Sequence, residues 1–257
     1  DDHDFIEDVE ARERAGTPGL PQIRRAAAAF ELLGQVGWER IEAAERAHLS
    51  AVLDAWSGTD RLVLYGPPEP ARRIGLVSFN VKAANGALVH PKLVARLLND
   101  LFGIQARAGC SCAGPYGHVL LGLDEAQTEA CRRAVLAGQA GLRPGWVRVS
   151  LHWTLSRAER DYLVEAVRFL AAEAARLAAL YRYEPETGAW RLRDRSGESR
   201  LAAESGGAML YPAALEAARA LADEIQDVGS TPVRLPVEGD GAQAIWSAAG
   251  RDGALQR

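Results

Sequence analysis

The sequence predicts an α/β protein of the α+β type, in which helices cover one face of a mostly antiparallel sheet. Between residues 61 and 178, short apolar segments alternate with longer segments of helical periodicity, in the order strand, strand, helix, strand, helix, strand, helix. Two further helical segments precede this region. Of the 257 residues, 48% are hydrophobic and 25% are charged, as is typical of a globular protein with a sizeable core.

The first two helices are expected over residues 19–36 and 38–56, because apolar residues recur at helical spacing in both and Gly37 separates them. A later helix begins after Ser156, which forms a capping box with Glu159, and ends near residue 178. The remaining elements between them are four strands, at 61–66, 74–81, 104–109 and 145–153, and two helices, at 90–102 and 124–138.

The region after Tyr181 is expected to be an extension of the sheet domain. The turn sequence "EPETG" between aromatic residues predicts a hairpin. A polar linker follows at 195–207, and then an amphipathic helix near 208–226. The last 30 residues are rich in Gly, Pro and small residues, and we expect them to be loosely ordered.

Composition excludes several classes of protein. A formal net charge of -4 argues against nucleic acid as a partner. No apolar run reaches about 18 residues, so no membrane span is predicted. Three cysteines are too few for a disulfide framework, which favours a reducing, cytoplasmic setting. The sequence begins with Asp1 rather than methionine, and we expect it to be truncated.

The stretch "GIQARAGCSCAGPYGH", residues 103–118, holds two cysteines one residue apart. Cys110, Cys112 and His118, with Cys131 as a fourth ligand, match zinc donor chemistry, but C-x-C is not the usual zinc spacing and no metal site is predicted. The C-x-C spacing also differs from the C-x-x-C pattern of thioredoxin-like redox sites. A nucleophile loop fits better, because the cysteines follow a strand, are bordered by glycines and lie near Arg107. A tight turn of small residues remains the structural alternative.

This stretch resembles the loop "G-I-x-x-R-x-G-x-x-C-A-x-P" of class V aminotransferase-fold enzymes, which include group II cysteine desulfurases and selenocysteine lyases. Arg107, Gly109 and Cys112 match the pattern, as do Ala113 and Pro115. The resemblance implies that Cys112 is the catalytic nucleophile and that Arg107 belongs to the substrate site. Cys110 falls where the family often has histidine.

Two further stretches resemble the same family. In "WVRVSLHWTLSRAERDYLVEAV", Arg148 matches the arginine that binds the substrate carboxylate, and His152 is expected on the same face of the strand. In "EARERAGTPGLPQI", Gly16 and Thr17 match residues at the cofactor phosphate of the other subunit. The three motifs occur in the family's order, and the resemblance covers roughly residues 7–178.

The resemblance implies the C-terminal part of a fold-type I enzyme that depends on pyridoxal 5′-phosphate. Residues 1–57 would then be the last helices of the large domain with a linking helix, residues 58–180 the small C-terminal domain, and residues 181–257 an extension. The family's cofactor lysine lies upstream of the "G-T-P" stretch, and neither Lys82 nor Lys92 matches it. We therefore expect this chain to lack the Schiff-base lysine and to be inactive alone.

The function implied is that of a cysteine desulfurase, which removes sulfur from cysteine through an enzyme persulfide. Its expected partners are a small amino-acid substrate, a second copy of the chain in a homodimer and a sulfur-acceptor protein. One alternative is an aminotransferase, epimerase or lyase that uses the cofactor and Arg148 without a catalytic cysteine. Another is a non-catalytic binding domain. The segment between Cys112 and Arg148 is longer than in typical desulfurases.

Overall fold

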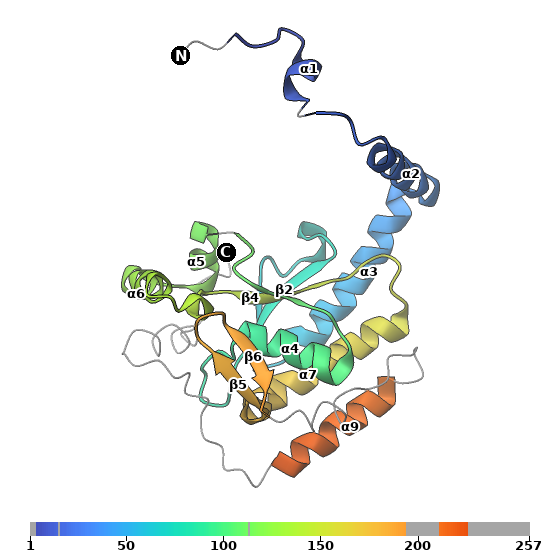
Figure 1. The fold of residues 1–257 in the computed structure, drawn as a ribbon. Coiled ribbons are helices and arrows are strands. Elements are labelled where there is room, and N and C mark those ends of the chain that lie inside the picture. Colours follow the sequence, from blue (N-terminus) through green and yellow to red (C-terminus); the bar gives the residue numbers. More distant parts are fainter. Residues whose placement is uncertain (1–3, 15, 113, 194–210, 226–257) are drawn as a thin grey trace. The chain divides into compact units, whose positions relative to one another are not determined.

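The computed structural model describes residues 4–14, 16–112, 114–193 and 211–225 (Figure 1). The chain divides into two compact units, residues 1–44 and 45–257. The division falls inside the long helix α3, Trp38–Ser57. Each unit is described on its own below.

The first unit contains α1 (Val9–Glu13), α2 (Leu20–Val36) and the beginning of α3. The two expected helices are confirmed at almost the expected bounds. Gly37, at φ 91°, adopts a backbone conformation that favours glycine and separates them. Neither α1 nor α2 has a buried residue. Large apolar side chains are exposed here: Phe5, Ile6, Val9, Leu20, Ile23, Phe30, Leu32 and Trp38.

The second unit is built on a four-stranded sheet in which every neighbouring pair is antiparallel. The strand order is β1-β2-β4-β3. The four strands confirm the expected sheet, with these bounds: β1 (Leu62–Tyr65), β2 (Leu76–Val81), β3 (Arg107–Gly109) and β4 (Trp146–Ser150). β3 is shorter than expected because Ile104 still belongs to the preceding helix end, where its N–H donates to the carbonyl of Leu98 at 3.0 Å.

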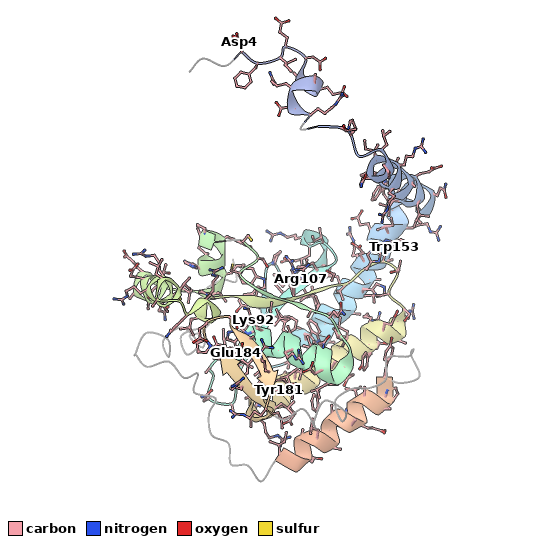
Figure 2. The ribbon with its side chains drawn as sticks, in the orientation of Figure 1. Asp4, Lys92, Arg107, Trp153, Tyr181 and Glu184 are labelled. Carbon is pink, nitrogen blue, oxygen red and sulfur yellow. The ribbon has the colours of Figure 1, made fainter. Side chains whose placement is uncertain are left out.

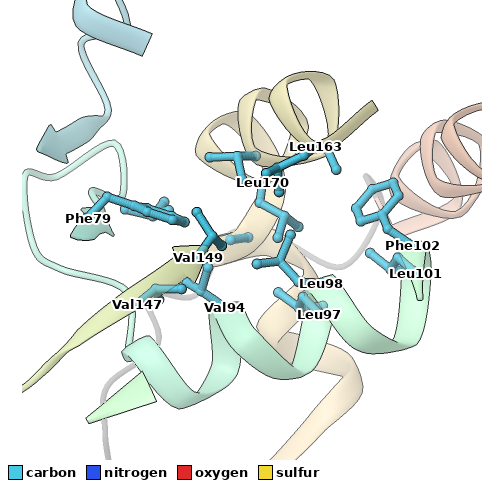
Figure 3. Close-up of a cluster of buried hydrophobic side chains, with 14 of the residues drawn as sticks. Phe79, Val94, Leu97, Leu98, Leu101, Phe102, Val147, Val149, Leu163 and Leu170 are labelled. Atoms are coloured by element: carbon cyan, nitrogen blue, oxygen red, sulfur yellow. The ribbon is translucent and has the colours of Figure 1, made fainter. Parts of the chain in front are cut away.

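One face of the sheet is covered by α4 (Pro91–Phe102) and α7 (Arg157–Leu177), and the core lies between them. Figure 3 shows Phe79 of β2 and Val147 and Val149 of β4 facing the leucines of these helices. From α3, Trp56 packs on Phe79 with ring centroids 5.2 Å apart. The strand residues between these core positions therefore face the opposite side of the sheet.

Part of that second face is covered by two shorter helices, α5 (Gly114–Leu121) and α6 (Glu125–Leu136). Leu121 packs with Tyr65 and Trp146, and Cys131 packs with Leu88. The expectation that helices cover one face is therefore incomplete. The sequence did not predict α5, because two glycines and a proline interrupt its helical pattern. In the described part of the chain, short 3-10 turns lie at Pro70–Arg72, Ala140–Leu142 and Ala178–Leu180.

The described parts of the extension belong to the same core. The expected hairpin is confirmed as β5 (Tyr181–Glu184) and β6 (Ala189–Leu192), and the expected helix as α9 (Tyr211–Glu224). Tyr211 stacks on Tyr162 of α7 at 4.1 Å between ring centroids. α9 buries small side chains at a spacing of four residues, namely Ala214, Ala218 and Ala222. The expected linker at 195–207 and the last 30 residues lie outside the described residues.

His90 joins α4 to the hairpin and is 4% exposed. Its Nδ1 accepts the backbone N–H of Lys92 at 3.1 Å, and its Nε2–H donates to the carbonyl of Gly141 at 3.0 Å. Its ring lies against Tyr183 and Trp190. Burial, assisted by the charge of Lys92 and opposed by the Gly141 carbonyl, lowers the pKa of His90 to about 4. Protonation of Nδ1 would also break the hydrogen bond that this nitrogen accepts from the backbone N–H of Lys92.

We expect His90 to make the protein less stable in mild acid. An unfolded histidine has a pKa of about 6.5. Between about pH 6.5 and 4 the unfolded chain therefore binds a proton that the folded chain does not. The free energy of unfolding is highest above this range and falls as the pH drops through it, by about 2 to 4 kcal/mol.

Urea unfolding at pH 7 and pH 4.5 measures this loss in the wild type and in His90→Asn, which keeps a capping acceptor for α4. The variant should lose the part of the difference that His90 contributes, about 2 kcal/mol, and should keep the part that comes from carboxylates such as Glu184, whose pKa the hydrogen bond from Arg191 lowers. His152→Asn, at an exposed histidine, is the matched control and should keep the wild-type difference. An unchanged pH dependence in His90→Asn would contradict the assignment.

Candidate functional site

The second face of the sheet carries two arginines on neighbouring strands. Arg148 of β4 is paired directly with Arg107 of the edge strand β3 and, on its other side, with Ser78 of β2. Residues paired in this way have Cβ atoms about 4.5 to 5.5 Å apart and point to the same face. Arg107, labelled in Figure 2, is exposed, whereas Arg148 is half-buried.

The two like charges repel each other, and directly opposed like charges destabilise a sheet. Within the described ranges, no carboxylate or carbonyl forms a hydrogen bond or ion pair with either guanidinium, whereas many other arginines of the chain are paired. Each guanidinium has five N–H donors in a planar arrangement that matches carboxylate or phosphate. Arg107 and Arg148 therefore form a site suited to an anion.

The cysteine loop follows β3 directly. Cys110 is half-buried, and Ser111 and Cys112 are both exposed. Ser111 and Cys112 have φ angles of 53° and 56°, and these are the non-glycine residues in the left-handed region within the described chain. Such residues carry a conformational cost, which is often found at functional sites. The loop thus presents the Cys112 thiol to solvent.

Both ends of this loop are held against the start of β4. Gly109 and Gly145 are in such close backbone contact that a Cβ on Gly145 would lie 2.5 Å from the Gly109 carbonyl carbon. Beyond the loop, Gly117 of α5 packs on the Trp146 ring, 3.3 Å from the position of an added Cβ. Buried Asn80 donates to the Gly145 carbonyl at 3.0 Å and so holds this segment in turn.

The other candidate residues have structural contacts. Nδ1 of His118 lies 3.4 Å from the Thr128 hydroxyl of α6, and Nδ1 of His152 lies 2.7 Å from the Thr154 hydroxyl. Cys131 is buried, and burial raises the pKa of its thiol to about 11. Among the residues that the structure describes, no group of three or more His, Cys, Asp or Glu side chains is placed to hold a metal ion.

Neither lysine belongs to the arginine site. The Lys92 ammonium donates to the Thr187 carbonyl at 2.7 Å, in the turn of the hairpin shown in Figure 2. Lys82 follows β2 and forms an isolated bridge with Leu88. Gly16 and Thr17 lie in the first unit, between α1 and α2, and both are exposed.

Comparison with known proteins shows what kind of chain carries this site. Its sequence matches the family "Aminotransferase class-V" over residues 3–163, which is more than half of the chain. The chain belongs to the class V aminotransferase family. This confirms the resemblance drawn from the three motifs, and every predicted site residue falls inside the matched range. Enzymes of this family use pyridoxal phosphate and generally act on amino acids.

Several curated members of the class V family that resemble this chain are cysteine desulfurases. The "Cysteine desulfurase" of Haloferax volcanii is 35% identical over 109 residues, covering 42% of this chain and 24% of that protein. The "Probable cysteine desulfurase" of Halobacterium salinarum is 32% identical over 153 residues, covering 60% of this chain and 30% of that protein. This chain thus spans less than a third of the length of either relative.

A solved structure, "Apo structure of Cysteine Desulfurase from Thermococcus onnurineus NA1", has a TM-score of 0.49 and 27% identity, covering 62% of this chain and 33% of that one. In this class V chain, none of the described helices is long and apolar enough to cross a membrane. The sequence pointed to Cys112, Arg107 and Arg148 as candidates, but not to Asn80 and Gly145, which hold the segment beside them. Asn80 and Gly145 come close to the loop only because strands that are distant in the sequence pair in the sheet. No local sequence pattern could therefore have identified them.

Substitution of Gly145 by alanine should displace the cysteine loop. The added Cβ would overlap the backbone of Gly109, which has no flexible side chain to move away. We expect a loss of about 1 to 3 kcal/mol in the free energy of unfolding, as for other overpacked sites, and a changed alkylation rate at Cys112. The control is Gly58→Ala, where an added Cβ meets nothing within 4 Å. Equal stability and equal alkylation rates in the two variants would refute the contact.

Proposed function

We propose that the complete protein is a cysteine desulfurase in which Cys112 receives the sulfur of the substrate as a persulfide. One observation carries this proposal: an exposed cysteine in a left-handed loop follows a strand whose Arg107 is paired with Arg148. The nucleophile and the carboxylate-binding groups are thereby attached to the same two strands. The similarity to curated cysteine desulfurases supports this choice among the activities of the family.

The residues of this chain fit part of a pyridoxal-phosphate site. The exposed Thr17 hydroxyl, next to Gly16, is a suitable donor for a phosphate, and Arg107 and Arg148, which have no partner among the described residues, suit the substrate carboxylate. Pyridoxal phosphate, when bound, supplies the electron sink that weakens bonds around the substrate α-carbon. Lys92 is engaged by the hairpin, so we assign the anchoring lysine to a part of the complete protein outside this chain.

The roles of the chain's own groups follow from their chemistry. Arg148 and Arg107 hold the substrate carboxylate and so orient the substrate thiol toward the loop. The Cys112 thiolate attacks the substrate sulfur, forming an S–S bond while the carbon–sulfur bond breaks. The electron pair of the broken bond stays with the carbon skeleton, which takes up a proton and leaves as alanine.

The proposal includes partners. A homodimer places Thr17 at the cofactor phosphate of the other subunit, and a thiol-bearing acceptor protein takes sulfur from exposed Cys112. Since three cysteines occur without a disulfide framework, we assign the protein to a reducing compartment, the cytoplasm. The aminotransferase, epimerase or lyase alternative would use the cofactor and Arg148 without a catalytic cysteine, and a binding domain would use neither Cys112 nor Arg148 for catalysis.

Alanine formation from cysteine in a single turnover of the complete enzyme tests the proposal. Cys112→Ala should abolish it while substrate binding survives, because the arginines remain. Cys110→Ala is the matched control in the same loop and should keep most of it. If Cys112→Ala turns over like the wild type, the nucleophile assignment fails and the alternative within the family takes its place.

The arginine site has its own test in the same assay. Arg148→Ala should raise KM for cysteine about 10- to 100-fold, because a hydrogen bond to a charged group contributes roughly 1.5–3 kcal/mol. Arg107→Ala should raise KM in the same direction. Arg219→Ala, at an exposed arginine of α9, which packs on the two helices that cover the other face of the sheet, is the control and should leave KM unchanged. A wild-type KM in Arg148→Ala would contradict the carboxylate role.

A further inference from the structure

We propose that Cys110 is a resolving thiol, which attacks the persulfide on Cys112 and releases its sulfur as hydrosulfide. This inference rests on the proposed function, because it requires a persulfide at Cys112. The proposed function itself does not use Cys110, although Cys110 lies only one residue from the nucleophile. The inference gives the C-x-C pair a chemical role and gives the site a second way to discharge sulfur, besides transfer to an acceptor.

The backbone already meets the distance requirement of a disulfide. Two Cα atoms separated by one residue are about 5 to 7 Å apart, because consecutive Cα atoms lie 3.8 Å apart. Most disulfides have Cα separations of roughly 4.4 to 6.8 Å. Ser111, between the two cysteines, is in the folded left-handed conformation at φ 53°, which favours the shorter part of that range. No large movement is therefore needed to join the two sulfurs.

The anchors on either side keep the thiols together. Gly109 precedes Cys110 and is in close contact with Gly145, and α5 begins at Gly114 and packs on Trp146 through Gly117. The intervening loop is short and both of its ends are attached to the same segment of β4. Its two thiols therefore encounter each other much more often than either meets a thiol in solution.

The different exposure of Cys110 and Cys112 indicates which thiol receives sulfur and which one attacks the persulfide. Cys112 is exposed and accessible to a substrate, while Cys110 is half-buried and less accessible to external sulfur donors. The third thiol, Cys131, is buried on α6, and its pKa is raised to about 11, so it does not compete. Cys112 is thus the residue that receives sulfur, and Cys110 is the neighbour that attacks it.

The reaction is balanced without an added oxidant. The Cys110 thiolate attacks Sγ of Cys112, a Sγ–Sγ bond forms, and the bond from Cys112 Sγ to the outer sulfur breaks. The outer sulfur leaves with the electron pair as hydrosulfide, so it is reduced while the two cysteines are oxidised to a disulfide. A dithiol reductant, by thiol–disulfide exchange, then restores both thiols for the next turnover.

The 257-residue chain tests this step without the cofactor. Inorganic polysulfide loads exposed thiols with sulfane sulfur, and excess reagent is removed by gel filtration. Mass spectrometry of the 103–118 region then follows the species with time, and released sulfide is measured in parallel. In the wild type, the extra sulfur on Cys112 should disappear and be replaced by a Cys110–Cys112 disulfide, with one equivalent of sulfide released.

In Cys110→Ser the persulfide on Cys112 should persist about tenfold longer or more, because the neighbouring attacking thiol is lost. Decay in the wild type should not depend on protein concentration, since the attack is intramolecular. Cys131→Ala, at the third thiol, is the control and should behave like the wild type. Equal thermal unfolding temperatures establish that the variants are folded.

The outcomes separate the two proposals. Equal persulfide lifetimes in the wild type and in Cys110→Ser would overturn the resolving role and leave Cys112 as the nucleophile. Failure of Cys112 to accept sulfur in both proteins would overturn both the resolving role and the proposed nucleophile. Decay that accelerates with protein concentration would assign the attack to a second molecule and would also overturn the inference.

Discussion

The close backbone contact between Gly109 and Gly145 determines how the candidate site is assembled. No side chain larger than hydrogen fits at Gly145, because an added Cβ would lie within 2.8 Å of three atoms of Gly109. The contact joins the end of β3 to the start of β4. It therefore fixes the cysteine loop with respect to the strand that carries Arg148. Asn80, buried at 0% exposure, reinforces the contact by holding the Gly145 carbonyl.

The rest of the second unit keeps this frame rigid and leaves the arginines accessible. α4 and α7 bury the apolar strand residues on one face, and α9 packs against both helices. α5 and α6 pack against the other face around Tyr65, Trp146 and Leu88. Arg107 remains exposed and Arg148 half-buried beside this region. The two groups that the proposed reaction needs are thereby carried by one strand pair and its loop: the arginines lie on β3 and β4, and the Cys112 thiol lies in the loop after β3.

The spacing of apolar residues predicted most of the helices and strands. An element that buries one face repeats its apolar residues with the period of a helix or a strand, and this repeat is visible in the sequence. The helices at 19–36 and 156–178 and the strand ending in Val81 are examples. α5 was missed because Gly114 and Gly117 disguise its helical pattern, although Gly117 is needed for the contact with Trp146. The pairing of Arg107 with Arg148 was also not predictable, since register between distant strands depends on tertiary packing. The resemblance proposed individual site residues, but it did not give their arrangement.

The most direct test of the account compares two alkylating reagents at Cys112, one neutral and one carrying a carboxylate. If Arg107 and Arg148 form an anion site beside the loop, iodoacetate should be favoured over iodoacetamide at Cys112 relative to free cysteine. The preference should fall with added salt, because exposed charges are screened. It should disappear in the double variant Arg107→Gln/Arg148→Gln. An identical ratio of the two alkylation rates in the wild type and the double variant would contradict the account.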